Sequence, residues 1–554
     1  MSTPRRLAVL LLLGTALFMA GAQMGLFSAP GGSGGGISLG PGISLPAGPT
    51  TLSEGVVGLP AQVLPLFAKS GADRAIVALT YRALTRLDVS GEPVPDLATS
   101  WSVSEDGLTW TIALDPAGAW EDGTPVSAAD AQMTIGLAGE LGLDGGYWDA
   151  LTVEVREDDG ALIIGAPRPL ANLPAALGTL PLLPAHLFSG NAAREIPQLD
   201  AAATPMGSGP FRVTGFSSSA AALQRRTDLL VGDQQALSAE DSTAMGGTVE
   251  SIALYFFATP EEALSSWTAG NLDALVGLDW SSANIGVTAL GSEVELGSTV
   301  FNGIAVNLRP GTVLRHPKLR LGLRALLTPS EIVNAYGGRE VAAPVSPLSW
   351  GWSAVPTPVR GVEYATKQML AAKWKFKDGV WLDADRKAVR LEILTLPAQA
   401  FPQDAAVANQ AASVWSSFGV PTSVIELDAA ALTEHLATGD FDLAVLNVDV
   451  GIDPDLYPLF GSAAVLSGGN VVGIQLKELD SLLNTARQPA TLEVRKKALA
   501  AVQRWCAANN YLLPIRFQAR ELLIAPRLTG VAPLLVREPE THLRDVLSFR
   551  LAAE

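Results

Sequence analysis

Cysteine is almost absent from this chain of 554 residues, which contains Cys506 alone. An intrachain disulfide is therefore impossible, which is compatible with an exported protein whose core is large enough to need no covalent links. Cys506 lies in an alanine-rich helical stretch, Thr491 to Ala508, beside Val502 and Trp505. No motif there would stabilise a thiolate, so we expect Cys506 to pack in the core and not to act as a nucleophile.

Histidine is also scarce, and the motifs of common catalytic sites are missing. None of the four histidines pairs with another at a spacing of four residues: His186, His316, His435 and His542. The sequence has no H-E-x-x-H motif, no cysteine pair and no phosphate-binding Walker loop. Asp453 and Asp455 resemble a carboxylate pair, but no further acid is placed opposite them. We therefore expect no enzyme activity, no resident metal and no cofactor.

Positive charge is in the minority, with 38 Lys and Arg against 55 Asp and Glu, for a net charge of -17. This balance argues against binding to nucleic acids or anionic membranes, both of which require a basic surface, and it favours solubility. The hydrophobic share of 48% is that of a globular protein. At 554 residues the chain is too long for one compact core, so we expect two or more lobes.

The N-terminus has the order of an export signal. Arg5 and Arg6 precede the apolar run Leu7 to Leu13, and Ala20-Gly-Ala22 resembles a cleavage site. The apolar character continues to Phe27, which is long enough to span a bilayer, so residues 1–27 are either a cleaved signal peptide or a retained membrane anchor. No cysteine is present there to carry lipid. Residues 28–51 are rich in Gly, Pro and Ser and predict a flexible linker.

The segment from Tyr81 to Asp130 predicts a β-hairpin followed by a capped helix. Residues 101–103 and 108–112 alternate large and small side chains, and Asp106-Gly107 between them is a strong hairpin signal. Asp122-Gly123 predicts the next turn. Ser127 then caps a helix, with Asp130 in the position of a capping-box carboxylate.

The order of residues in this segment resembles the signature of family-5 extracellular solute-binding proteins, the peptide- and nickel-type receptors of bacterial ATP-binding-cassette importers. The residues that carry the resemblance are Leu87-Asp88, Gly91, Pro95-Asp96-Leu97-Ala98, Ser100-Trp101, Asp106 to Thr111 and Asp122-Gly123-Thr124-Pro125. Further matches are Pro205 to Arg212, Gly303 to Leu308, His316 to Arg320, Thr328 to Val333 and Tyr511 to Phe517. The resemblance therefore covers roughly Leu52 to Gly530.

The resemblance implies an α/β fold of two lobes, similar to periplasmic binding proteins, with a hinge and an interlobe ligand cleft. It implies a first lobe of residues 52–306, a second lobe of residues 307–514, and a return of residues 515–554 to the first lobe. Within the second lobe, Val389 to Val448 reads as a βαβαβ unit, which makes a parallel sheet. Ligands of such sheets bind beyond the carboxyl ends of the strands.

The residues at that carboxyl end are the first site candidates: Asn447, Asp449, Asp453 and Asp455. Three interpretations of the acidic residues stay open. They form turns and helix caps around Asp453-Pro454, they bind a cationic group such as a peptide amine, or they bind calcium, although the spacing does not fit an EF-hand. In peptide-binding members of the family an aspartate just before this turn pairs with the peptide amine, and Val450 takes that place here.

The resemblance places the remaining candidates at the edge of the first lobe and in a proline-rich loop of the second. Ser70, Asp73 and Tyr81 belong to the first group, and Tyr81 is expected to pack as well. Trp350 and Trp352 belong to the loop, where a tryptophan either packs or stacks on a ligand.

The resemblance thus implies an exported receptor that captures a small solute by closure of two lobes and delivers it to the permease subunits of an importer. It would work as a monomer in the periplasm or on the outer face of the cytoplasmic membrane, without nucleic acid. A peptide or peptide-like ligand is the first interpretation, and nickel or a metal chelate is the second. A membrane-tethered sensor domain without transport is the alternative from another class.

Overall fold

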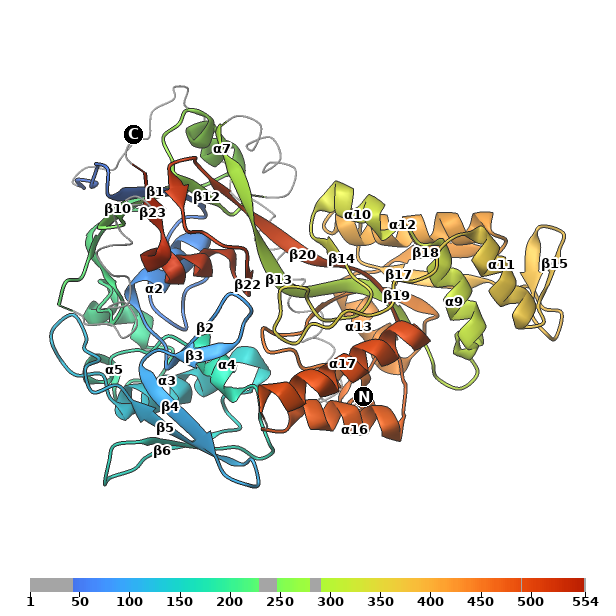
Figure 1. Ribbon diagram of the computed structural model, residues 1–554, viewed down its shortest axis with the longest axis horizontal. Coiled ribbons are helices and arrows are strands. Elements are labelled where there is room, and N and C mark those ends of the chain that lie inside the picture. The colour runs from blue at the N-terminus through green and yellow to red at the C-terminus, as the bar shows by residue number, and fades with distance from the viewer. Residues whose placement is uncertain (1–42, 229–246, 279–289, 490, 553–554) are drawn as a thin grey trace. The chain divides into compact units, whose positions relative to one another are not determined.

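The computed structural model describes residues 43–228, 247–278, 290–489 and 491–552 (Figure 1). The predicted export segment and most of the linker lie outside these residues. The chain divides into two compact units, of which one contains Gly297–Ala519 and the other contains Pro30–Leu296 with Arg520–Glu554. Both divisions fall inside long strands, β13 (Ser292–Val306) and β20 (Leu512–Ile524). The expectation of a two-lobed α/β fold is confirmed.

The unit that contains the chain's early residues is built on a mixed sheet. Strand β1 (Thr51–Val57) pairs in parallel with β11 (Ser251–Phe257) and with β12 (Ala274–Val276). The sheet continues through β9 (Ala220–Arg225) to β8 (Phe211–Phe216), both antiparallel to their neighbours. Helix α2 (Gly71–Thr80) packs its apolar residues against this sheet.

A second, smaller sheet in the same unit contains the predicted hairpin. Its order is β4 (Ala98–Val103), β5 (Thr109–Leu114), β7 (Leu162–Gly165) and β6 (Thr152–Val155). In the turn between β4 and β5, Gly107 takes a positive φ of 74°, and Asp106 Oδ1 accepts a hydrogen bond from the Leu108 N–H at 3.0 Å. Ser127 precedes α3 (Ala128–Glu140) in a capping box with Asp130, as predicted.

The remaining elements of this unit are helices and short strands, and some of the strands form two further small sheets. They are β2 (Thr85–Leu87), β3 (Pro93–Pro95), η1 (Leu143–Gly145), α4 (Leu173–Gly178), α5 (Ala185–Phe188), η2 (Ile196–Gln198), η3 (Asp200–Ala202), β10 (Gly247–Thr248), α7 (Pro260–Thr268), β21 (Leu528–Thr529), β22 (Leu534–Val536), η6 (Pro539–Ser548) and β23 (Arg550–Leu551).

The other unit contains the predicted βαβαβ segment. It runs β17 (Leu391–Thr395), α12 (Pro402–Ser417), β18 (Thr422–Glu426), α13 (Ala429–Thr438) and β19 (Leu443–Asp449). Strand β17 is parallel to both β18 and β19, so the predicted parallel sheet is confirmed. Asp428 caps α13, which ends at Gly439 with a φ of 77°.

The strand order in this unit is β18-β17-β19-β13-β20. Helix α12 leads from β17 to its neighbour on one side, whereas α13 leads from β18 to β19 on the other side of β17. The chain direction across the sheet therefore reverses between β17 and β19. Such a reversal opens a crevice at the carboxyl ends of the strands, which is where open α/β sheets bind their ligands.

The other elements of this unit, of which β14 pairs with β20, are η5 (Val313–Arg315), α9 (Pro317–Leu326), α10 (Pro329–Tyr336), β14 (Arg339–Glu340), α11 (Val362–Ala371), β15 (Lys375–Lys377), β16 (Val380–Leu382), α14 (Tyr457–Phe460), α15 (Ala464–Ser467), α16 (Lys477–Arg487) and α17 (Leu492–Asn509). Cys506 is buried in α17, where burial raises the pKa of its thiol to about 12, so the core assignment is confirmed. Among the described residues no helix is long and apolar enough to cross a membrane.

Candidate functional site

The buried carboxylate of Asp404 and the side-chain amide of Asn447 meet near β17 and β19, between which the order of strands along the chain reverses. Asp404 comes from the first turn of α12, directly after β17, and Asn447 comes from the carboxyl end of β19. Asn447 Nδ2 donates to both oxygens of Asp404, at 2.8 Å to Oδ1 and 2.7 Å to Oδ2. Both side chains are buried.

Two more amides complete this group, which we name the amide cluster: Asn302, Asp404, Asn447 and Gln518. Asn447 Oδ1 accepts hydrogen bonds from Asn302 Nδ2 on β13 at 3.0 Å and from Gln518 Nε2 on β20 at 3.1 Å. Gln518 is half-buried and forms the accessible end of the cluster. Asn302 Oδ1 is buried and makes no hydrogen bond to any of the residues that the structure describes.

The electrostatics of the cluster are unusual because the hydrogen-bond donors to the Asp404 carboxylate are neutral amide side chains. Burial raises the pKa of the Asp404 carboxyl to about 6, and the hydrogen bonds from Asn447 and the charge of Arg516 oppose that rise. The Arg516 guanidinium itself donates to the backbone oxygens of Tyr336 and Gly337, at 2.6 and 2.5 Å. Asp404 is thus poised to change its protonation in a mildly acidic medium.

Sequence reasoning predicted only one member of the amide cluster, Asn447. Asp404 was missed because it lies in a helix whose capping pattern explains an acidic residue in the first turn. Gln518 and Asn302 lie in strands that read as core. The signal available was positional: Asp404 follows the first strand of the βαβαβ unit, and Asn447 ends its last strand.

The predicted acidic residues of the β19 turn have partners within their own unit. Asp453 is buried and forms a two-pronged ion pair with Arg495 of α17, with a distance of 2.8 Å from Nη1 to Oδ2. The same guanidinium lies 4.8 Å from the centre of the Trp350 ring. Arg495 is therefore a cationic partner of Asp453 within the protein, and the binding of a cationic ligand by Asp453 stays a prediction.

Asp449 lies at the end of β19 and is half-buried. Its Oδ1 accepts a hydrogen bond from the Gly451 N–H at 2.9 Å, and Asp455 Oδ1 accepts one from the Tyr457 N–H at 3.0 Å. Both contacts are turn chemistry of the kind that the first interpretation predicts. Asp449 lies two residues after Asn447, a member of the amide cluster, on the same strand.

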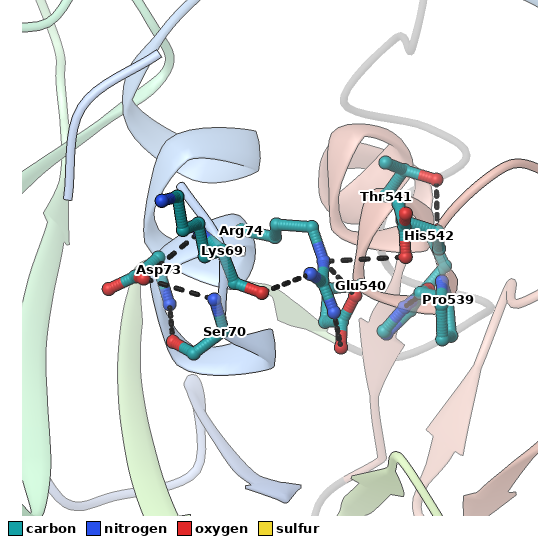
Figure 2. Close-up of polar contacts among 9 residues, drawn as sticks. Lys69, Ser70, Asp73, Arg74, Pro539, Glu540, Thr541 and His542 are labelled. Atoms are coloured by element: carbon teal, nitrogen blue, oxygen red, sulfur yellow. Dashed lines mark hydrogen bonds and ion pairs between the residues drawn. The ribbon is translucent and has the colours of Figure 1, made fainter. Parts of the chain in front are cut away.

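Ser70 and Asp73 form a local structural motif at the start of α2 (Figure 2). The Asp73 carboxylate accepts hydrogen bonds from four backbone N–H groups, those of Ala61, Gln62, Lys69 and Ser70. Ser70 Oγ accepts from the Asp73 N–H at 3.0 Å in return. Asp73 is fully buried, so its contacts hold the loop before α2.

Arg74, the next residue, joins α2 to the C-terminal η6 (Figure 2). Its Nε donates to Glu540 Oε2 at 2.9 Å, and its Nη1 donates to the Lys69 carbonyl at 2.7 Å. Ser70 and Asp73 therefore lie beside a packed contact between α2 and η6. Contact of Ser70 and Asp73 with a ligand stays a prediction.

The aromatic candidates differ in exposure. Tyr81 is buried, its hydroxyl accepts from the Met206 N–H at 3.2 Å, and burial raises the pKa of that hydroxyl. Trp350 is buried under Arg495. Trp352 is 42% exposed and is the aromatic candidate with a free face. Among the described residues no group of three or more His, Cys, Asp and Glu side chains is arranged to hold a metal ion.

Residues 92–465 match the sequence model of a protein family, and this match covers more than half of the chain. The family is described as bacterial extracellular solute-binding proteins, family 5, middle. The chain belongs to this family. It is therefore an extracytoplasmic solute-binding protein, and the resemblance found in the sequence is confirmed.

Two curated relatives differ in how much of the chain they match. The probable peptide ABC transporter periplasmic-binding protein y4tO of Sinorhizobium fredii is 28% identical over 150 residues, which is 27% of either chain. The oligopeptide-binding protein AppA of Bacillus subtilis is 24% identical over 454 residues, 79% of this chain and 80% of AppA.

Solved structures share the fold across almost the whole chain. The periplasmic murein tripeptide-binding protein MppA, in an unliganded open form, matches 91% of this chain and 98% of its own, with a TM-score of 0.72 and 18% identity. NikZ from Campylobacter jejuni, in complex with Ni(L-His), matches 91% of this chain and all of its own, with a TM-score of 0.62 and 21% identity. The same fold thus serves a peptide binder and a metal-chelate binder.

Proposed function

We propose that this protein is the receptor of an ATP-binding-cassette importer and that it captures peptides or peptide-like solutes. The observation that carries the ligand class is the alignment with oligopeptide-binding AppA, which extends over 79% of this chain. The amide cluster supports the same class, because amide side chains offer the donors and acceptors that a peptide backbone requires.

The mechanism in this proposal is closure of the two units on the ligand, with higher affinity in the closed state. The permease subunits of the importer are the proposed partners. The N-terminal segment would keep the receptor outside the cytoplasm, either after cleavage or as a retained anchor. N-terminal sequencing of the protein recovered from cells distinguishes these two states, because cleavage near Ala22 gives a new amino terminus.

Mass spectrometry of the ligand released from purified, denatured protein tests the proposed ligand class. Recovery of peptides at a stoichiometric amount supports the proposal. Recovery of nickel with a small organic chelator, or of a solute without amide bonds, contradicts it. Isothermal titration with synthetic tetrapeptides then measures affinity in the refolded, ligand-free protein.

A further inference from the structure

Gln518 is the one member of the amide cluster that is half-buried. Only the nitrogen of its side-chain amide makes a hydrogen bond to the described residues. Its Nε2 donates to Asn447 Oδ1 at 3.1 Å. Its Oε1 makes no hydrogen bond to the residues that the structure describes. The free acceptor lies at the accessible end of a chain of hydrogen bonds whose other end is the buried Asp404.

The charge of Asp404 determines the orientation of each side-chain amide in this series of hydrogen bonds. An ionised carboxylate only accepts hydrogen bonds, so Asn447 must direct Nδ2 toward it. Asn447 Oδ1 then faces the opposite direction, where it accepts from Gln518. Gln518 consequently directs Nε2 inward and Oε1 outward.

We propose that Asp404, Asn447 and Gln518 form a relay that presents Gln518 Oε1 as a hydrogen-bond acceptor for an N–H group of the ligand. The inference rests on the proposed function and narrows it, since the ligand must then carry an amine or amide N–H at this position. Gln518 is the binding residue of the relay, and Asp404 and Asn447 are positioning residues.

Protonation of Asp404 allows every link of the relay to reverse. The protonated carboxyl has an O–H donor, which Asn447 satisfies by turning its Oδ1 toward Asp404. Asn447 Nδ2 then faces Gln518 and Asn302. Asn302, which had directed its Nδ2 toward Asn447, turns as well and offers its buried Oδ1, which has no partner among the described residues. Gln518 turns its Oε1 inward and presents N–H donors to the ligand.

The groups around Asp404 allow this change. Its neighbours on β13 and β19 are the neutral side chains of Asn302 and Asn447. The charged group that acts on it is Arg516 on β20, whose guanidinium lies 5.9 Å from the ring of Tyr336 on α10. Because no carboxylate or ammonium is hydrogen-bonded to Asp404 among the described residues, its proton controls the amides directly.

The first experiment needs no ligand. Side-chain amide resonances of full-length protein labelled with ¹⁵N in Asn and Gln are followed from pH 4.5 to 7.5. The relay predicts that the amide signals of Asn447 and Gln518 move together with one midpoint near that of Asp404, and that they stay still in Asp404→Asn. A Gln518 signal that does not move in the wild type overturns the relay.

The second experiment measures binding at pH 7.5 with an equimolar mixture of synthetic tetrapeptides that have free termini. Gln518→Leu removes the acceptor, and we expect a five- to tenfold loss of affinity, the size of one hydrogen bond. Gln132→Leu in α3 is the matched control on the other unit and should bind as the wild type does.

The outcomes separate the two proposals. If the wild type fails to bind the peptides, the proposed ligand class is wrong, while the resonance experiment still decides the relay. If the wild type binds and Gln518→Leu binds equally well, the relay is not part of the peptide site and the inference is overturned.

Discussion

Two buried aspartates, one in each unit, show how the donors around a carboxylate decide what it can do. Asp73 is 0% exposed and Asp404 is 2% exposed, so burial does not distinguish them. Asp73 receives four backbone N–H groups, whereas both oxygens of Asp404 are held by the side-chain amide of Asn447. Backbone donors are fixed by the chain, but a side-chain amide can turn over.

The difference assigns each aspartate a different kind of role. Asp73 cannot change its partners without unfolding the loop before α2, so it stabilises structure. Asp404 can change from acceptor to donor when Asn447 turns, so it can transmit a signal to Gln518. Asp453, paired with the charged Arg495, is the third case, in which removal of one partner leaves a buried charge.

The largest expected effect is on Asp453. Asp453→Ala leaves Arg495 buried without its carboxylate, and we expect a loss of about 4 kcal/mol in the free energy of unfolding of that unit. Urea denaturation measures this loss. The double variant Asp453→Ala with Arg495→Met should lose clearly less than Asp453→Ala alone. Equal losses would mean that the ion pair is not what holds this turn.

Asp73→Ala is expected to cost about 3 kcal/mol, because four backbone N–H groups lose their buried acceptor. Ser70→Ala, which removes only the cap of α2, should cost about 1 kcal/mol. Urea denaturation of both variants makes the comparison. A loss below that of Ser70→Ala would contradict the view that Asp73 is the fixed member of the pair.

The stability contribution of Asp404 should depend on pH. Its pKa is about 6 in the folded protein against an ordinary value of 3.8, so the folded state binds the proton more tightly. This stabilisation is fully present below the unfolded pKa and is lost as the pH rises through about 6. Asp404→Asn removes it, so the variant should gain about 1 kcal/mol relative to the wild type between pH 5 and 7.5.

Thermal unfolding of the two proteins at both pH values measures this difference. Ser70→Ala is the control, because it changes no charge. Its difference in stability from the wild type should be the same at pH 5 and pH 7.5. An Asp404→Asn offset that does not change with pH would contradict the assignment of Asp404 as the titrating member.

The smallest expected effect on stability is at Trp352. Because its side chain is 42% exposed, Trp352→Ala should change the free energy of unfolding by less than about 0.5 kcal/mol. Its effect on tetrapeptide affinity, measured by calorimetry, tests whether the exposed face stacks on the ligand. Trp350→Ala is the contrasting variant, since it removes a buried ring from beneath Arg495 and should destabilise the unit.

Local chemistry made much of the fold predictable from the sequence. Asp106-Gly107 and the capping box at Ser127 each act within a few residues, and the structure has them as expected. The site was less predictable because its partners are distant. Asp404 is 43 residues and Gln518 is 71 residues from Asn447 in sequence, and Arg495 is 42 residues from Asp453.

The measurement that tests the central claim most directly is the pH dependence of peptide affinity between pH 4.5 and 7, where the termini of the peptide keep their charges. For the wild type we predict that affinity for the tetrapeptide mixture falls as the pH drops below the pKa of Asp404, which is about 6. For Asp404→Asn we predict an affinity that is independent of pH over this range. The same pH profile in both proteins would contradict the account.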